Sequence, residues 1–381
     1  MRLLIVIPIL SSNVGGMERF VIEFSTRLAS SGHDVTIITG RKGGDLQLDG
    51  VKIIRHRLFF PRYFSKLIKY AHISWIARSH LKKNKYDAVL AMGHSGLFLK
   101  GFIWRASGSP VPMVREARRK MRISSLSRMI ISLDLFTQER MERACIRKAT
   151  CHMFPSMSMK SDYERIYGFS AGRYFIPCSG TGSEYAATDQ ELDILLNTPG
   201  LKILTVDGLS AETKGRDLII DAFSRMDIGC SFLVAAGRVD EEKLKEPLLS
   251  RTIRLGRVEF SKMPAVYKSC DFLIFPSLTE GFPNVLLEAA YYGLPIISSR
   301  LEGIEEYFTD GRDILLVEKG DPKGLAQRIE QLSNSVEMRR KLSENAMKRA
   351  KAIDYRIFAK EFVSFVSSDK VKDVNLLATM V

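Results

Sequence analysis

The stretch DFLIFPSLTEGFPNVLLEAAYYGLPIISS, residues 271–299, contains apolar runs at both ends and a helix-compatible run between them. The ends predict buried β-strands, and Pro283 suits the first turn of a helix because the N–H that it lacks would have no partner there. Gly293 and Pro295 predict where that helix stops. A strand, a crossover helix and a second apolar strand form the repeating unit of parallel α/β sheets.

The same alternation runs through the 381 residues. In the first half the predicted strands are LLIVIPIL, DVTIITG, KYDAVLAMG and VPMV, with a helix from about residue 18 to 29. In the second half they are KILTVDG, SFLVAAG, TIRLG, DFLIFPS and LPIISS. Because the chain exceeds what one core organises, we expect two Rossmann-like domains, residues 1–178 and 179–354, with a boundary near the turn-rich IPCSGTGSE.

Charge is divided unequally between the two halves. Residues 1–180 hold 30 Lys and Arg against 12 Asp and Glu, a net +18, whereas residues 181–381 hold 27 against 31, a net −4. The five scattered cysteines lack metal-site spacing and are expected to be reduced and structural. The N-terminal MRLLIVIPIL is read as a strand and not a signal peptide, and no apolar run approaches the roughly 18–20 residues of a spanning helix.

Two acids, Glu280 and Glu288, bracket the start of the predicted helix at residue 283. The backbone N–H groups of Asn284, Val285 and Leu286 would carry partial positive charge there, which suits a diphosphate. Carboxylates bind hydroxyl groups well, so the pattern fits a ligand with a sugar, a diphosphate and a ribose in sequence. The alternative is an ordinary loop acid and a solvated helix residue.

The segment EGFPNVLLEAAYYGLPIISS resembles the E-x7-E donor signature of glycosyltransferase family 4, whose members are retaining enzymes of the GT-B fold. Weaker similarity extends over nearly the whole chain, including SSNVGGMERF and the ETKG loop. The resemblance implies an α/β GT-B fold whose two parallel sheets face a central cleft. It also implies that a C-terminal helix, about residues 355–381, packs back on the first domain.

The resemblance implies roles for particular residues. Glu288 would bind the ribose hydroxyls, Glu280 would hold the sugar, and Lys214 would neutralise the diphosphate, with Glu280 and Lys214 as the catalytic pair. A lysine in a loop between a strand and a helix can also reach a phosphate on general grounds. Other residues expected at the donor are Gly15, Gly16, Gly281, Phe282, Asn284, Val285 and Leu286.

The chain also departs from the family pattern. A second cation usually precedes the lysine, but here Ala211, Glu212 and Thr213 do, and Arg216 is the candidate substitute. The N-terminal domain's usual histidine is missing from VREARRK, where Glu116 or an arginine is the candidate replacement and loss of the contact is the alternative. His94, after another strand, is a candidate for the acceptor or the cleft.

The predicted function is therefore a retaining transfer of sugar from a nucleotide-diphosphate sugar to a glycan or lipid-linked acceptor, in lipopolysaccharide or cell-surface polysaccharide synthesis. The sequence has no Asp-x-Asp triplet, so neither a metal nor a cofactor is expected. The alternative is a non-catalytic, membrane-bound protein that kept the fold. A nicotinamide-dependent oxidoreductase is poorly supported, because strand one leads to SSNVGG and not to G-x-G-x-x-G.

The basic N-terminal half predicts an anionic partner. Residues 62–85 mix apolar and cationic side chains in a helical pattern, and VREARRKMRISSLSRM adds a second cationic stretch. We expect a cytoplasmic protein held peripherally on the inner face of the cytoplasmic membrane. The alternative is that the apolar residues of 62–85 pack on the sheet. Nucleic acid is not expected, since no binding motif accompanies the charge.

Overall fold

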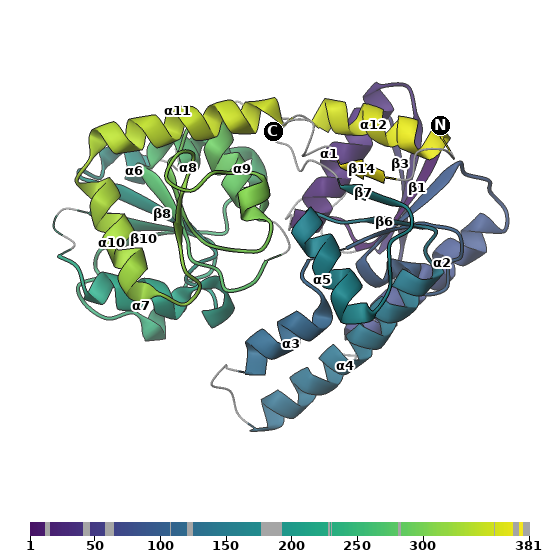
Figure 1. Cartoon of the computed structure of the whole chain (residues 1–381), viewed down its shortest axis with the longest axis horizontal. Coiled ribbons are helices and arrows are strands. Elements are labelled where there is room, and N and C mark those ends of the chain that lie inside the picture. The colour runs from purple at the N-terminus through teal and green to yellow at the C-terminus, as the bar shows by residue number, and fades with distance from the viewer. Residues whose placement is uncertain are drawn as a thin grey trace. The chain divides into compact units, whose positions relative to one another are not determined.

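The computed structural model describes residues 1–11, 16–40, 46–57, 65–106, 108–119, 125–176, 193–227, 229, 231–280, 283–353, 355–368 and 373–375. The chain divides into two compact units (Figure 1). Unit 1 comprises residues 1–182 and 354–380, and unit 2 comprises residues 183–353. The predicted boundary between residues 178 and 179 lies outside the described residues.

Unit 1 is built on a parallel sheet in which eight strands are described, in the order β14-β7-β6-β5-β4-β1-β2-β3. The strands are β1 (Arg2–Ile9), β2 (Asp34–Gly40), β3 (Val51–His56), β4 (Ala88–Met92), β5 (Ile103–Arg105), β6 (Cys151–Met153), β7 (Tyr174–Ile176) and β14 (Asp373–Asn375). The helices are α1 (Gly16–Ser30), α2 (Ser65–Leu81), the 3-10 turn η1 (Gly93–Gly96), α3 (Val111–Arg119), α4 (Ser125–Lys148), α5 (Met157–Tyr167) and α12 (Tyr355–Ser367). The central strands are continuous apolar runs, as expected for a sheet covered on both faces.

The expectation of a strand at VPMV is wrong, because these residues begin helix α3. Pro112 is the second residue of the helix, where its missing N–H costs nothing. The Val111 amide is satisfied by the Glu142 Oε2 atom of α4 at 3.0 Å. The strand in this part of the sheet is β5, whose three residues are too few to show a pattern.

Helix α12 belongs to unit 1, although unit 2 precedes it in the sequence. It lies beside α1 (Figure 1), and the Phe358 ring packs against Phe24 at a centroid distance of 4.7 Å and against Phe20 at 5.6 Å. Phe175 of β7 contacts the same ring at 5.4 Å. The C-terminal helix therefore completes the apolar core of the first unit.

Unit 2 has a second parallel sheet, in which six strands are described, in the order β10-β9-β8-β11-β12-β13. The strands are β8 (Lys202–Val206), β9 (Phe232–Ala236), β10 (Thr252–Gly256), β11 (Phe272–Phe275), β12 (Ile296–Ser299) and β13 (Leu315–Val317). The helices are α6 (Asp193–Asn197), η3 (Glu212–Lys214), α7 (Arg216–Ser224), η4 (Glu241–Lys243), η5 (Phe260–Lys262), α8 (Met263–Ser269), α9 (Asn284–Tyr291), η6 (Ile304–Glu306), α10 (Pro322–Ser333) and α11 (Val336–Ala352). One core cluster joins this sheet to α7 and α10 through residues that include Ile219, Phe223, Leu325 and Ile329.

The strand order reverses once in each sheet. In unit 2 the first strand, β8, lies between β9 and β11, so the loops after β8 and β11 leave in opposite directions. In unit 1 the same position lies between β1 and β4. In open parallel sheets ligands bind beyond the carboxyl ends of the strands at such a switch point. The architecture of each unit therefore suits a binding site at the carboxyl ends of the strands beside its switch point.

Candidate active site

Lys214 and Glu280 meet at the switch point of unit 2. Lys214 ends η3, after β8, and Glu280 lies in the loop after β11; the Lys214 Nζ atom is 2.6 Å from Glu280 Oε1. The Ser277 hydroxyl donates to the same carboxylate oxygen at 3.2 Å. Both side chains of the ion pair keep some exposure, 38% for the lysine and 20% for the glutamate. The pair is therefore preformed and reachable from solvent.

The two loops that carry this pair are held together by their backbones. The Leu278 amide donates to the Thr213 carbonyl at 3.0 Å, and the Ser277 hydroxyl oxygen lies 3.1 Å from the same carbonyl, an alternative acceptor for its single hydrogen. Gly215 has a φ of +90°, and a Cβ atom there would lie 2.3 Å from the Pro276 carbonyl oxygen. Only glycine fits such a contact, so the sequence K-G places the lysine against the second loop.

Glu288 lies one turn inside α9 and is buried. The Tyr267 hydroxyl of α8 donates to Glu288 Oε2 at 2.8 Å, and the buried Tyr267 ring stacks on Tyr292 at a centroid distance of 5.9 Å. This hydrogen bond fixes one oxygen of the carboxylate. A carboxylate held in this way can accept hydrogen bonds from a diol without first losing rotamer freedom.

Helix α9 begins at Asn284, immediately after Pro283, as predicted. Of the three amides expected to face an anion, that of Leu286 donates to the Pro283 carbonyl at 3.0 Å, within the first turn. Asn284 and Val285 occupy the first two helical positions. Gly281 and Phe282 lie outside the described residues.

Arg216, the candidate second cation, is held by two carboxylates. Its guanidinium lies 2.7 Å from Asp217 Oδ1 and 2.7 Å from Asp240 Oδ2, and the side chain is 14% exposed. The hydrogen bond to Asp217 raises the pKa of the guanidinium. The structure thus joins Arg216 to Asp240 in the loop after β9.

The sequence did not predict two features near the carboxyl ends of the strands of unit 2. Tyr267 gave no signal, because a tyrosine in a short apolar helix looks like ordinary core. The second feature is a polar pocket of about 450 Å³ lined by Ser210, Arg238, Val239, Asp240, Glu241 and Glu242. It adjoins the ends of β8 and β9, so Arg238 is a further cation at this edge of the sheet.

In unit 1, Gly16 and His94 follow β1 and β4, the two strands at the switch point. Gly16 is the first residue of α1, and His94 lies in η1 after β4. His94 is buried, and its ring meets Tyr70 edge to face at 4.9 Å. Burial raises the pKa of Tyr70 to about 12. Gly15 lies outside the described residues, and Glu116 lies in α3 with an undescribed side chain.

Glu142 of α4 is the buried acid that anchors α3. Besides the Val111 amide, it accepts hydrogen bonds from the hydroxyls of Tyr163 (2.9 Å to Oε1) and Tyr167. Burial raises the pKa of this carboxyl. With donors on both oxygens, Glu142 is a structural acid that positions the first turn of α3.

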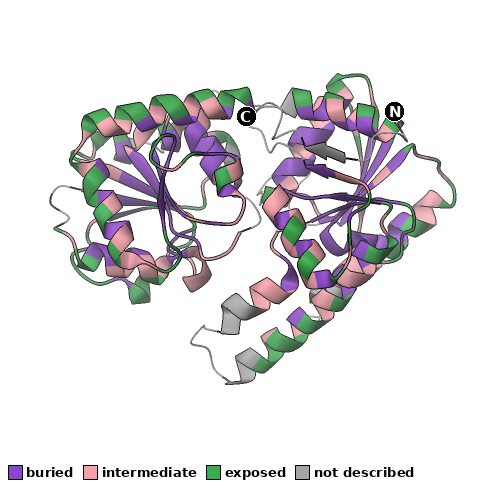
Figure 2. Ribbon diagram, in the orientation of Figure 1, coloured by how far each residue is buried: buried purple, intermediate pink, exposed green. Residues whose placement is uncertain are grey.

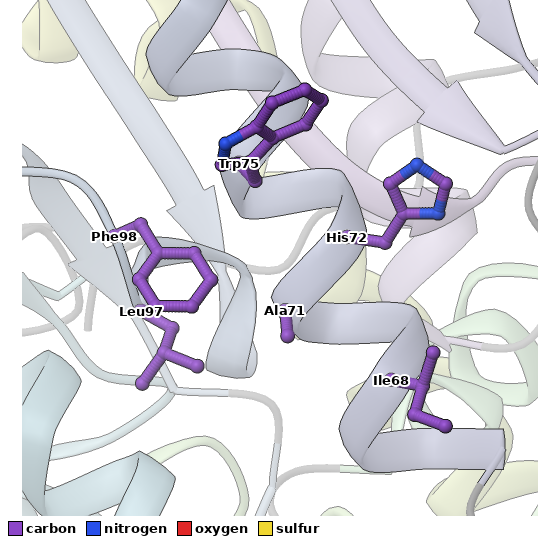
Figure 3. Close-up of a pocket in the computed structure, with 6 residues that line it drawn as sticks. All are labelled: Ile68, Ala71, His72, Trp75, Leu97 and Phe98. Atoms are coloured by element: carbon purple, nitrogen blue, oxygen red, sulfur yellow. The ribbon is translucent and has the colours of Figure 1, made fainter.

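An apolar groove of about 530 Å³ lies between α2 and the segment after η1, and Figure 3 shows its lining. The lining residues are Ile68, Ala71, His72, Trp75, Leu97 and Phe98. Lys148 Nζ donates to the Leu97 carbonyl at 2.7 Å. The groove therefore has an aromatic wall and an adjacent cation.

The comparisons with known proteins agree with this fold. A family model described as Glycosyltransferase Family 4 matches residues 14–178, and one described as Glycosyl transferases group 1 matches residues 200–335. An uncharacterized glycosyltransferase of Methanocaldococcus jannaschii is 31% identical over 43% of this chain and 47% of its own length, so the match spans about half of that relative. The lipopolysaccharide core biosynthesis glycosyltransferase LpsE of Rhizobium meliloti is 25% identical over 87% of this chain and 89% of its own length.

Solved structures share the fold over almost the whole chain. Sucrose-phosphate synthase from Thermosynechococcus elongatus matches with a TM-score of 0.78 at 18% identity, covering 96% of this chain and 98% of that one. WaaG, a glycosyltransferase involved in lipopolysaccharide biosynthesis, matches with 0.75 at 17% identity, covering 96% and 100%. Anabaena HepE in complex with UDP-glucose matches with 0.70 at 16% identity, covering 96% and 99%. The family models match consecutive parts of the chain, one in unit 1 and one in unit 2, and the neighbours have the GT-B fold, so the chain is similar to family 4 and group 1 glycosyltransferases over most of its length.

Proposed function

We propose that the protein transfers a sugar, with retention, from a nucleotide-diphosphate sugar to a glycan or lipid-linked acceptor in lipopolysaccharide or cell-surface polysaccharide synthesis. The observation that carries the proposal is the placement of Lys214, Glu280 and Glu288 around the switch point of unit 2. The names of LpsE and WaaG support the pathway class, and the HepE complex supports a nucleotide sugar as donor.

In this proposal each residue meets a different part of the donor. Glu288, with one oxygen held by Tyr267, accepts hydrogen bonds from the ribose hydroxyls. Lys214 moves from Glu280 to the diphosphate, and Glu280 then accepts from the hydroxyls of the transferred sugar. The amino end of α9 faces the same diphosphate with its partial positive charge.

The reaction exchanges one bond at the anomeric carbon. The bond from this carbon to the phosphate oxygen breaks, a bond to the acceptor oxygen forms on the same face, and the acceptor's proton passes to the departing phosphate. Negative charge grows on the diphosphate as it leaves, and Lys214 lies where it would stabilise that charge. We propose that no metal or cofactor is required, since the sequence has no Asp-x-Asp triplet and the lysine supplies a positive charge.

The proposal includes a location, the cytoplasmic face of the membrane that holds the acceptor. The net +18 of residues 1–180 supports this part, because anionic lipids attract a basic surface. Among the helices that the structure describes, none is long and apolar enough to cross a bilayer.

The first experiment is a thermal-stability screen of the purified protein against nucleoside diphosphates and nucleotide sugars. We expect one base to raise the Tm selectively and Glu288→Ala to lose that response. Turnover should fall about 100- to 1000-fold in Lys214→Met and in Glu280→Gln while their Tm stays close to that of the native protein. A flat screen would favour a non-catalytic relative, whereas near-normal turnover in both folded variants would overturn the roles assigned to Lys214 and Glu280.

A further inference from the structure

Helix α4 presents a row of large apolar side chains to solvent. Met129, Ile130, Leu133 and Phe136, called here the α4 stripe, are 63%, 43%, 52% and 48% exposed. Met129, Leu133 and Phe136 follow each other at the i, i+4, i+7 spacing of one helix face. Scattered exposed apolar residues are ordinary, whereas four within eight positions on one helix form a patch.

The stripe lies on a part of unit 1 that extends beyond its sheet. In Figure 1, α3 and the first half of α4 run outward from the sheet, and Figure 2 shows that most residues of this half whose burial is described are exposed. The second half is packed into the unit, where Met141, Cys145 and Ile146 are buried. The fold therefore anchors α4 at one end and presents the stripe at the other.

The surrounding sequence is strongly basic. Residues 115–128, which precede the stripe in the sequence, contain six Arg and Lys and one Glu, a net charge of +5. An apolar row beside a cationic segment is the composition of helices that lie in the interface of anionic bilayers. A second copy of the chain fits less well, because pairing two stripes would bring two such basic segments together.

Helix α2, the stretch whose sequence first indicated membrane contact, is mostly committed to the core. Its Ile73, Ile76 and Ala77 are buried, and Trp75, at 59% exposure, is the large apolar residue of this helix that remains exposed among those described. The apolar residues needed for insertion are therefore on α4.

We propose that the α4 stripe is the element that inserts into the headgroup region of an anionic membrane, to which the net positive charge of the 115–128 sequence attracts it. The inference rests on the membrane-associated part of the proposed function and names the surface that performs it. Neutralisation of lipid charge draws the segment to the bilayer, and burial of the apolar row holds it there.

The test compares binding of the full chain to vesicles of phosphatidylglycerol mixed equally with phosphatidylcholine and to vesicles of phosphatidylcholine alone. We expect binding to the anionic vesicles that weakens with salt. Met129→Gln/Leu133→Gln should lower the partition coefficient about 10- to 100-fold, because it removes two apolar side chains without changing charge. Leu196→Gln/Val336→Gln is the matched control, since it removes two residues of unit 2 that are each 70% exposed.

Three vesicle results would overturn the inference: no binding of the native protein to anionic vesicles, equal losses in the stripe and control variants, or full binding by the stripe variant, which together with a loss in Trp75→Gln would assign the contact to α2. Sedimentation velocity supplies the remaining test, because a native dimer that the stripe variant abolishes would identify a second copy as the occupant. The stripe variant should keep the native Tm and the native response to nucleotide in the absence of vesicles. A missing nucleotide response with stripe-dependent vesicle binding would refute the enzyme assignment and leave this inference intact.

Discussion

Replacing Gly215 by alanine tests how the loops of unit 2 hold Lys214 in place. The residue adopts φ +90°, and a Cβ atom would meet the Pro276 carbonyl oxygen at 2.3 Å and its Cγ atom at 2.7 Å. The left-handed backbone costs an alanine about 1–2 kcal/mol. The clash with a backbone that the Leu278–Thr213 hydrogen bond restrains adds about 1–3 kcal/mol.

Gly311→Ala separates these two contributions. Gly311 also belongs to unit 2 and has φ +74°, but nothing lies within 4 Å of its added Cβ atom. Its replacement should therefore cost the backbone contribution alone, about 1–2 kcal/mol. Differential scanning calorimetry of the native protein and both variants gives the difference, which at about 3 °C per kcal/mol should lower the Tm of Gly215→Ala by about 3–9 °C below that of Gly311→Ala.

Donor binding provides the second readout. Displacing the 213–215 turn should weaken the nucleotide response in Gly215→Ala and leave it unchanged in Gly311→Ala. Equal Tm values for the two variants would refute the steric argument. An equal nucleotide response in both variants would show that Gly215→Ala destabilises the loop without displacing Lys214.

Three further predictions concern buried groups. Tyr267→Phe should raise the Kd for nucleotide about tenfold in calorimetric titration, because the Glu288 carboxylate loses its donor; an unchanged Kd contradicts this. Because burial raises the pKa of Glu142 in the folded state, the stability of unit 1 should fall as the pH rises above about 4.5, and Glu142→Gln should flatten the dependence of Tm on pH. Phe358→Ala should destabilise unit 1 by about 3–5 kcal/mol in urea unfolding, because the ring is buried against Phe24. Ile357 is about half exposed, so Ile357→Ala should cost less than about 1 kcal/mol. Similar losses in both variants would show that α12 is not part of the core.

The strands with long apolar runs could be predicted from the sequence, and the short ones could not. β1 and β2 bury nearly every residue, so their composition alone reveals them. β5, β6 and β7 have three residues each, too few for any periodicity to appear. The apolar VPMV segment was predicted as a strand because nothing nearby in the sequence marks a helix start. The carboxylate that accepts a hydrogen bond from its first amide belongs to Glu142, far along the chain.

Residues of the site could be predicted where the residue type and its position after a strand both indicated contact with the donor. Lys214 and Glu280 each follow a strand and were identified separately, but their contact across 66 residues depends on β8 and β11 being neighbours. Tyr267 lies 21 residues before Glu288, and only the folding of unit 2 brings them together. For α2, spacing identified a helical pattern, and only tertiary packing determined which face is covered; the α4 stripe was not identified from the sequence.

The return of α12 to unit 1 affects the order in which the units are completed during synthesis. Unit 2 is one continuous segment, whereas unit 1 needs residues from both ends of the chain. Phe20 and Phe24 emerge from the ribosome early, but the Phe358 ring that covers them is made more than 300 residues later, which at about 5–20 residues per second is a delay of roughly 17–70 s. The first unit to begin is therefore the last to finish, and a nascent chain carries an uncovered aromatic patch until Phe358 has been made.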